Sequence, residues 1–527
     1  MLGKIEEILE SVGAGVRNPI KKGPRKSIKM SVTDNMATED DINELLHIYE
    51  QYFDTVDAEH QPPSLVTPEL SLDDLQGGDL GMEEEYSLGT SVLAQNLGFI
   101  RDALPYQFNQ HRHQEGLTAW DQSFETSASK LSPLSLHWHQ LAAVHSIARR
   151  SFSKEPDTLP RGTLICDEVG LGKTTLAIAV GAFLNQLISI QDSDIKPPPL
   201  IQEQPFLLGH SEIPAYPHVI IAPGTLRQQW IHELKVLYRP KSVDILVYDC
   251  PKSGNQSFWS PSGPFHCSRH QLQNRIIVTT HSALQNEYLH VYGSTPSAAS
   301  ASKTPWELPD PRRPTKDTLF GQSYLTVIID EAHEFRNVGL KYYGGLTIMK
   351  KALIKLVLTA TPLLTSPKDL LGLARIIGIP HFLTEASVLE SREDAAALRR
   401  AKKVEDDGNT VQDMQISIVR RIQTQFHGYV LRRTGCSLDN AGKTLLNLPP
   451  YKQIVGILSL TDRENEILNQ HAEDAKANVI AGNDTGKFLT QKFYMEYRLN
   501  VAFAKTDPAA PNPAEAVTSM HNIWASA

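Results

Sequence analysis

The segment Leu164-Ile-Cys-Asp-Glu-Val-Gly-Leu-Gly-Lys-Thr-Thr175 joins a short β-branched run to a long apolar one, residues 176–187. Its glycines let backbone N–H groups close around phosphate oxygens, and a helix that begins here adds the positive end of its dipole. Lys173 is placed to reach the β- and γ-phosphates, and the Thr174 hydroxyl to ligate Mg²⁺. Asp167 stands where the general formula GxxxxGK[ST] has its first glycine, but the Gly-x-Gly-Lys-Thr core is intact. The segment therefore predicts a phosphate-binding loop between a strand and a helix.

Short apolar runs that alternate with helical patterns surround this loop and indicate an α/β fold. Because the runs are continuously apolar, we expect strands that are buried on both faces. Strands separated by helices indicate a parallel sheet with helices on both faces. The predicted strands are residues 163–166, 218–222, 243–248, 275–279, 324–330 and 355–359.

The predicted strand 324–330 ends in the acidic tetrapeptide Asp330-Glu-Ala-His333. Nucleotide hydrolysis needs one carboxylate to hold Mg²⁺ and another to orient and deprotonate water, roles that suit Asp330 and Glu331 respectively. In parallel α/β sheets ligands bind at the carboxyl ends of the strands, where both this box and the loop fall. By itself the tetrapeptide could also be a helix N-terminus with acids near its dipole.

A further predicted strand ends in Thr359-Ala-Thr361-Pro362. The two hydroxyls could relay a signal between the nucleotide site and a bound strand. They could equally form an ordinary strand end closed by a hydroxyl turn. The spacing leaves both interpretations open.

Charge is distributed unevenly along the 527 residues, although the net charge is −9. Residues 31–100 hold sixteen Asp or Glu and no Lys or Arg, so removing them leaves +7 on the rest. A uniformly basic nucleic-acid coat is excluded, but the remaining chain is compatible with an anionic partner. The acidic N-terminal residues do not form a signal peptide, and no stretch reaches the about 20 apolar residues of a membrane span. We expect an intracellular protein with no membrane contact.

Composition also predicts the domain boundaries. Residues 1–130 read as a largely disordered leader, with a basic run at 17–26 that is either an import signal or a linker, and a helical pattern at 40–53. Residues 131–385 form the nucleotide-binding lobe, and residues 386–465 its helical end. A helical or disordered tail follows at 466–527. Pro-, Ser- and Gly-rich stretches at about 190–217, 250–270 and 293–318 read as surface insertions.

The four cysteines are too scattered for a disulfide scaffold, and no Cys-x-x-Cys pair is present. His266, Cys267 and His270 could hold zinc, but their spacing fits no common zinc framework.

The order of these motifs resembles that of the SWI/SNF-type (Snf-two) ATPases, the DNA translocases of helicase superfamily two. Departures include Val169 where the family usually has Met, and Ala360 where Gly is commoner. The segments that carry the resemblance are 136–140 (entry motif with Gln140), 167–174 (motif I), 220–233 (motif Ia with Trp230), 278–281 (motif Ib), 330–337 (motif II), 358–363 (motif III), 431–434 and 448–450.

The resemblance implies a RecA-like P-loop lobe that hydrolyses ATP with Mg²⁺, acts on DNA in the nucleus and works with chromatin or repair subunits. DNA would be held by its backbone, independently of sequence. The implied residues are Gln140, Asp167, Glu168, Gly170, Leu171, Gly172, Lys173, Thr174, Thr175 and Asp330 for ATP and Mg²⁺ (the metal through Thr174 and Asp330); Lys173, Asp330 and Glu331 for catalysis; Thr359 and Thr361 for coupling; and Pro223, Thr225 and Thr280 for DNA contact.

The family's motor has a second lobe with a glycine-rich motif and a QxxGRxxR-like motif, and neither is found after residue 465. An arginine finger in related phosphoryl transfer is worth about 10³–10⁵ in rate. One lobe should therefore bind ATP and hydrolyse it poorly. Two alternatives remain: a non-catalytic, ATP-binding interaction module, and an RNA-directed helicase of the same superfamily. Trp230 and the form of motif I argue against the second.

Overall fold

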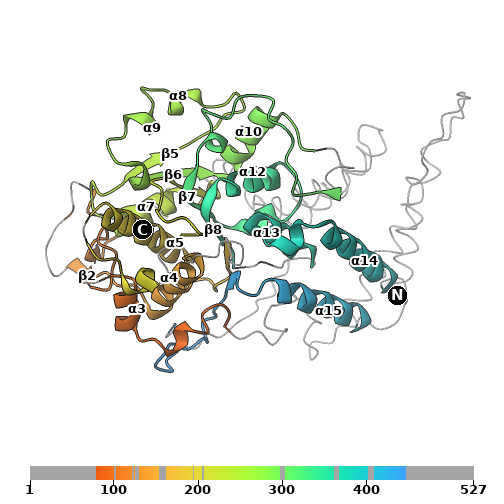
Figure 1. Cartoon of the computed structure of the whole chain (residues 1–527), viewed down its shortest axis with the longest axis horizontal. Helices are drawn as coiled ribbons and strands as arrows, with labels where there is room; N and C mark the ends of the chain where they lie inside the picture. Colours follow the sequence, from red (N-terminus) through yellow and green to blue (C-terminus); the bar gives the residue numbers. More distant parts are fainter. Residues whose placement is uncertain are drawn as a thin grey trace, which may run out of the picture. The chain divides into compact units, whose positions relative to one another are not determined.

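A seven-stranded sheet is the centre of the computed structural model (Figure 1), and its order is β5-β6-β4-β7-β8-β3-β9. Every neighbouring pair in this sheet is parallel. The structure describes residues 79–99, 102–121, 124, 130–152, 162–193, 195–203, 207–296, 303–360, 362, 367–401 and 409–446. The strands are β3 (Gly162–Ile165), β4 (His218–Ala222), β5 (Asp244–Val247), β6 (Arg275–Thr280), β7 (Tyr324–Ile329), β8 (Ala352–Leu358) and β9 (Val430–Leu431).

The six predicted strands are confirmed, with ends that differ by up to three residues. The seventh strand, β9, was not predicted, because the region after residue 385 was expected to be helical. Its two residues pair in parallel with Leu164 and Ile165 at the edge of the sheet. The C-terminal end of the lobe therefore runs directly beside the strand that leads into the phosphate loop.

Alternate residues of the strands enter two separate cores, as continuous burial predicts. Ile165 and Ile220 face the first core, while Leu164 and Ile221 face the second. The first core is covered by α3 (Thr90–Asn96), α4 (Trp138–Ser151), α5 (Lys173–Gln191) and α7 (Arg227–Leu237). The second is covered by α10 (His281–Tyr292), α12 (Leu340–Met349), α13 (Lys368–Ile377) and α15 (Asn409–Gln425), and α14 (Glu385–Ala401) packs beside α15 (Figure 1).

Helix α5 follows the phosphate loop and is long and apolar. By length and composition alone it could cross a membrane, although the sequence was expected to hold no such stretch. Of its most apolar window, 72% is buried inside the protein. The apolar composition is therefore that of a core helix, as the context of a phosphate loop predicts.

The predicted leader boundary at residue 130 is too late, because residues 79–99 and 102–121 are folded onto the lobe. Met82, Leu93 and Leu97 are buried in the first core. Glu85 is fully buried and accepts a hydrogen bond from the ring of His145 at 2.9 Å, while Arg149 pairs with it from α4. The acidic composition of this part predicts a linker, but its carboxylates have partners inside the fold. The basic run at 17–26 and the helical pattern at 40–53 lie outside the described residues.

The stretch at 250–270 was expected to be a surface insertion, but its aromatic side chains are buried. The rings of Phe258, Trp259 and Phe265 lie 4.8–6.3 Å apart in the second core, beside Tyr248. They are carried by two short helices, α8 (Gln256–Trp259) and α9 (Pro264–Cys267). Proline and serine therefore set the turns, and the aromatic residues anchor the segment.

Glu287 on α10 is an acid with almost no exposure in the second core. Its Oε1 accepts hydrogen bonds from the Tyr248 hydroxyl at 2.6 Å and from the Leu319 N–H at 3.0 Å. Burial raises the pKa of this carboxyl to about 7, against the pull of those two hydrogen bonds. The pKa of Glu287 is higher in the folded than in the unfolded chain. Its contribution to the free energy of unfolding is therefore fully present below about pH 4.5 and declines as pH rises toward 7.

Glu287→Gln is therefore expected to raise the thermal midpoint by a few degrees at pH 8 and to leave it nearly unchanged at pH 4.5. The measurement is a series of melting curves from pH 4.5 to 8. The control is Glu212→Gln, which alters an exposed acid. Equal pH profiles for wild type and the Glu287 variant would contradict the assignment.

Candidate nucleotide and nucleic-acid site

The phosphate loop turns sharply between β3 and α5 at two glycines. Gly170 has φ +94° and Gly172 has φ +76°, both in the left-handed region that favours glycine. A Cβ on Gly172 would lie 2.4 Å from Gln140 Nε2. The Gly-x-Gly spacing is thus required by backbone conformation, and at Gly172 the end of the Gln140 side chain also lies close.

Lys173 begins α5 and its side chain lies over its own loop. Its Nζ donates hydrogen bonds to the carbonyl oxygens of Asp167 at 2.8 Å and Glu168 at 3.3 Å. Thr174 and Thr175 are half-buried in the first turn of the same helix. The ammonium is therefore at the mouth of the loop, where phosphate oxygens could replace the two carbonyl partners.

Asp167, which departs from the general loop formula, is a buried partner of Arg433. Arg433 Nε donates to Asp167 Oδ1 at 2.8 Å, a second bond joins Nη2 to Oδ2, and both side chains are at most 1% exposed. The same guanidinium donates to the carbonyl of His139. Beside this pair, the Glu168 carboxylate accepts from the Gly435 N–H. The motif at 431–434 includes Arg433, but its pairing with Asp167 was not predicted; a further signal was an acid at a glycine position, which needs a cation if it is buried.

The acidic box follows β7. The Asp330 N–H donates to the Ile221 carbonyl of β4 at 2.9 Å, and the Asp330 side chain is buried. Its Oδ2 accepts from Trp230 Nε1 at 2.8 Å and its Oδ1 accepts from the Glu331 N–H at 2.9 Å. Burial raises the pKa of Asp330, opposed by these hydrogen bonds and by the Lys173 ammonium, whose charge reaches the box.

Glu331 has a left-handed backbone, with φ +46°, although it is not a glycine. Such strain persists where the surrounding structure enforces it, and it is commonest at functional sites. The Glu331 carboxylate lies 3.1 Å from Nδ1 of His333, and the same ring nitrogen lies 3.5 Å from Thr359 Oγ1. A polar chain therefore runs from the expected catalytic acid to the end of β8.

Strand β8 lies between β7 and β3, so its C-terminal end lies between the acidic box and the phosphate loop. The Thr359 N–H donates to the Ile165 carbonyl at 3.1 Å, next to the phosphate loop, and the residue is fully buried. This arrangement is compatible with a coupling role for Thr359, which stays a prediction. Thr361 lies outside the described residues, so its role stays a prediction.

The first turn of α4 also contacts the phosphate loop. Gln140 is buried; its Oε1 accepts from the His137 N–H at 2.9 Å and its Nε2 lies 3.5 Å from the Leu171 carbonyl. The ring of His139 contacts the same carbonyl at 2.9 Å, and burial together with the Arg433 charge lowers the pKa of His139 to about 4. Gln140 therefore braces the loop, and its adenine contact stays a prediction.

The predicted DNA contacts lie in the turn after β4 and at the last residue of β6. Thr225 is exposed and Pro223 half-buried in the turn between β4 and α7. Thr280 is buried, and its Oγ1 accepts from the Ala283 N–H at 3.1 Å as the cap of α10. The turn between β4 and α7 is therefore accessible to a ligand. Where β6 meets α10, the exposed side chain is that of Ser282, which was not among the predicted DNA contacts.

The side chains present fit a magnesium ion, which prefers oxygen donors. Asp330 offers a buried carboxylate, and Thr174 offers a hydroxyl at the start of α5. The suggested zinc cluster finds no support: among the described residues no group of three or more side chains could hold a metal ion.

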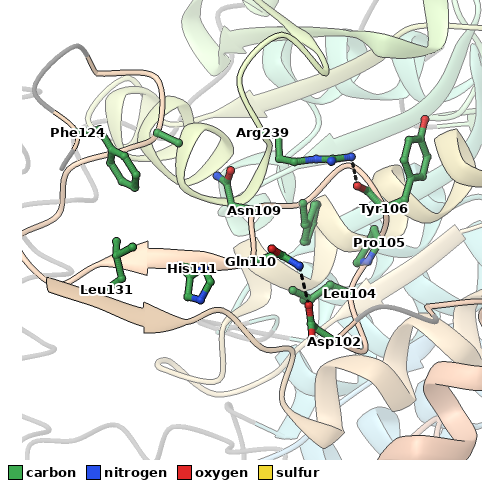
Figure 2. Close-up of a pocket in the computed structure, with 12 residues that line it drawn as sticks. Asp102, Leu104, Pro105, Tyr106, Asn109, Gln110, His111, Phe124, Leu131 and Arg239 are labelled. Atoms are coloured by element: carbon green, nitrogen blue, oxygen red, sulfur yellow. Dashed lines mark hydrogen bonds between the residues drawn. The ribbon is translucent and has the colours of Figure 1, made fainter. Parts of the chain in front are cut away.

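A separate pocket of about 290 Å³ lies beside the hairpin of β1 (His111–His113) and β2 (Leu131–Pro133), as Figure 2 shows. Gln110 Nε2 donates to Asp102 Oδ2 at 3.0 Å, and Arg239 donates to the Tyr106 carbonyl. None of its lining residues is a predicted site residue. The pocket is therefore separate from the predicted nucleotide site.

A parallel sheet with a phosphate loop and an acidic box at the ends of β3 and β7 defines a P-loop nucleotide-binding lobe. The comparison with known families then specifies it further. Residues 83–504 match the SNF2-related domain, and the chain belongs to that family.

Curated relatives are DNA repair proteins, each matched over part of its length. The chain is 24% identical to DNA repair protein RAD5 of Kluyveromyces lactis over 346 residues, which covers 63% of this chain and 27% of that protein. It is 26% identical to DNA repair protein rad5 of Emericella nidulans over 331 residues (61% and 24%), and 22% identical to RAD5A of Arabidopsis thaliana over 364 residues (63% and 30%). The chain therefore spans 24–30% of the length of these relatives.

Among solved structures, the Sulfolobus solfataricus SWI2/SNF2 ATPase core in complex with dsDNA is similar at a TM-score of 0.35 and 16% identity. The similarity covers 70% of this chain and 58% of that one.

Proposed function

We propose that this chain is the ATP-binding and hydrolysing lobe of a DNA-dependent ATPase. The observation that carries the proposal is the proximity of two motifs. The phosphate loop and the acidic box stand at the carboxyl ends of β3 and β7, with only β8 between them, and the charge of Lys173 reaches Asp330. Membership of the SNF2-related family supports the same proposal.

Each side chain has a separate role in this proposal. Lys173 leaves its two loop carbonyls and binds the β- and γ-phosphates, while the loop N–H groups surround the phosphate oxygens. Thr174 and Asp330 hold Mg²⁺, which when bound neutralises phosphate charge. Glu331 orients the attacking water and accepts its proton, and His333 at 3.1 Å steadies that carboxylate.

DNA is the proposed activator, on the support of the repair proteins to which the chain is related. Contact at Pro223 and Thr225, and at the loop of Thr280, would be to the phosphate backbone. Such contact is independent of sequence and weakens steeply with salt. A nuclear location and repair or chromatin partners belong to the same proposal.

The test is steady-state ATP turnover with and without double-stranded DNA, for wild type and Lys173→Ala. We expect slow turnover, stimulated by DNA and lost in the variant. ATP binding without turnover under any condition would favour the non-catalytic module instead. Stimulation by duplex RNA and not by DNA would favour the RNA-directed alternative.

A further inference from the structure

The two helices that follow the predicted DNA contacts, α7 and α10, both hydrogen-bond to Asp330. The turn after β4 continues into α7, which carries Trp230, and β6 continues into α10, whose first residue is His281. Trp230 Nε1 donates to Asp330 Oδ2 at 2.8 Å. His281 Nε2 lies 2.9 Å from the Asp330 carbonyl, and since a carbonyl only accepts, the ring nitrogen carries the hydrogen. Asp330 of the acidic box is thus hydrogen-bonded to both helices.

These contacts are shielded from water, so they transmit position efficiently. Trp230, His281 and Asp330 are 1%, 5% and 8% exposed. The ring of His281 also packs edge-on against Phe335 at 4.8 Å, which fixes its orientation. At these contacts α7 and α10 touch Asp330 directly, so a displacement of either helix also displaces Asp330.

Burial of tryptophan alone does not explain the Trp230 contact. Trp259 is equally buried, at 2% exposure, yet it packs in the second core among the rings of Phe258 and Phe265. Trp230 belongs to the first core and points its one N–H at the carboxylate expected to hold the metal. The two tryptophans therefore form a matched pair that differs in this hydrogen bond.

We propose that Trp230 and His281 are positioning residues that couple nucleic-acid contact at the two loops to the Mg²⁺-binding carboxylate of Asp330. This inference rests on the proposed function. A ligand on the loops changes the nucleotide site only if it favours one arrangement of α7 and α10 over another. By linkage, DNA and Mg²⁺-nucleotide must then raise each other's affinity by the same factor.

The experiment titrates a non-hydrolysable ATP analogue with Mg²⁺ into the full chain, with and without a 20-base-pair DNA duplex. For wild type we expect DNA to tighten nucleotide binding by about 5-fold or more, a typical size for coupling between sites. Trp230→Phe, which keeps a ring but removes the donor, should bring that ratio close to one. Trp259→Phe should keep the wild-type ratio.

The reverse titration of DNA, with and without Mg²⁺ and the analogue, should give the same factor for each protein. A structural defect alone would lower both affinities without changing the ratio. If Trp230→Phe does not fold, His281→Phe provides the second variant and should also lose the ratio. His281→Gln, whose amide can still donate to the Asp330 carbonyl, should recover part of it.

The outcomes separate the two proposals. If DNA tightens binding of the analogue to wild type, and Trp230→Phe and His281→Phe show the same ratio, the coupling is overturned and the proposed function is left intact. Wild type that binds the analogue without any DNA effect also overturns the coupling. Folded wild type that fails to bind the analogue at all overturns the proposed function, and the coupling with it.

Discussion

Glu331→Gln is expected to lower DNA-stimulated ATP turnover by about 10²–10⁴-fold, the usual contribution of a general base. The amide keeps the shape of the side chain but cannot accept the proton of the attacking water. ATP binding should change little, because Lys173, Thr174 and Asp330 remain. Single-turnover hydrolysis and equilibrium binding, measured on the same preparation, separate these two effects.

The matched control is Glu334→Gln, three residues away. That acid is exposed, pairs with Lys341 at 2.7 Å and lies 3.9 Å from His333 Nε2. Its variant should retain turnover within about twofold of wild type, since exposed ion pairs contribute little. Equal losses in both variants would contradict the assignment of the base to Glu331.

Arg433→Met is expected to destabilise the lobe and to weaken nucleotide binding together. The substitution leaves Asp167 buried without its cation, which typically costs about 3–5 kcal/mol. It also frees the loop that carries Lys173, because Asp167 and Glu168 are both held by the segment around Arg433. Thermal melting should show a midpoint lower by about 10 °C, and the affinity for ATP should fall at temperatures where the variant is still folded.

A double variant tests whether the pair itself is responsible. Asp167→Asn combined with Arg433→Met removes the unpaired charge and should recover part of the lost stability, so the two effects are not additive. Arg421→Met is the control, because Arg421 makes an exposed ion pair with Asp394 and should shift the midpoint little. Additive losses at Asp167 and Arg433 would contradict the pairing.

Much of the fold could be predicted from local patterns. The strands ending at Ile165, Ala222, Ile329 and Leu358 are continuous apolar runs, and the loop and the acidic box follow them directly. Strand β9 was missed because two residues after a helix carry no periodic signal. The folded residues 79–99 and 102–121 were not predicted, because acids such as Glu85 suggest a linker until their buried partners are known.

The contacts that organise the site could not be predicted, because they join distant residues. Trp230 and Asp330 are 100 positions apart, and Asp167 and Arg433 are 266 apart. Nothing in the spacing of either pair indicates that the side chains meet. The motifs name the groups that carry the chemistry, whereas the tertiary structure determines which side chains hold those groups in place.

Calorimetric titration of ATP into the full chain, with and without Mg²⁺, tests the central claim most directly. One ATP should bind per chain, more tightly with Mg²⁺. Lys173→Ala should weaken that binding by about 10–100-fold, as expected for loss of a charged hydrogen-bond donor. Folded wild type that binds no ATP in Mg²⁺, or a Lys173 variant with wild-type affinity, would contradict a nucleotide site formed by the phosphate loop and the acidic box.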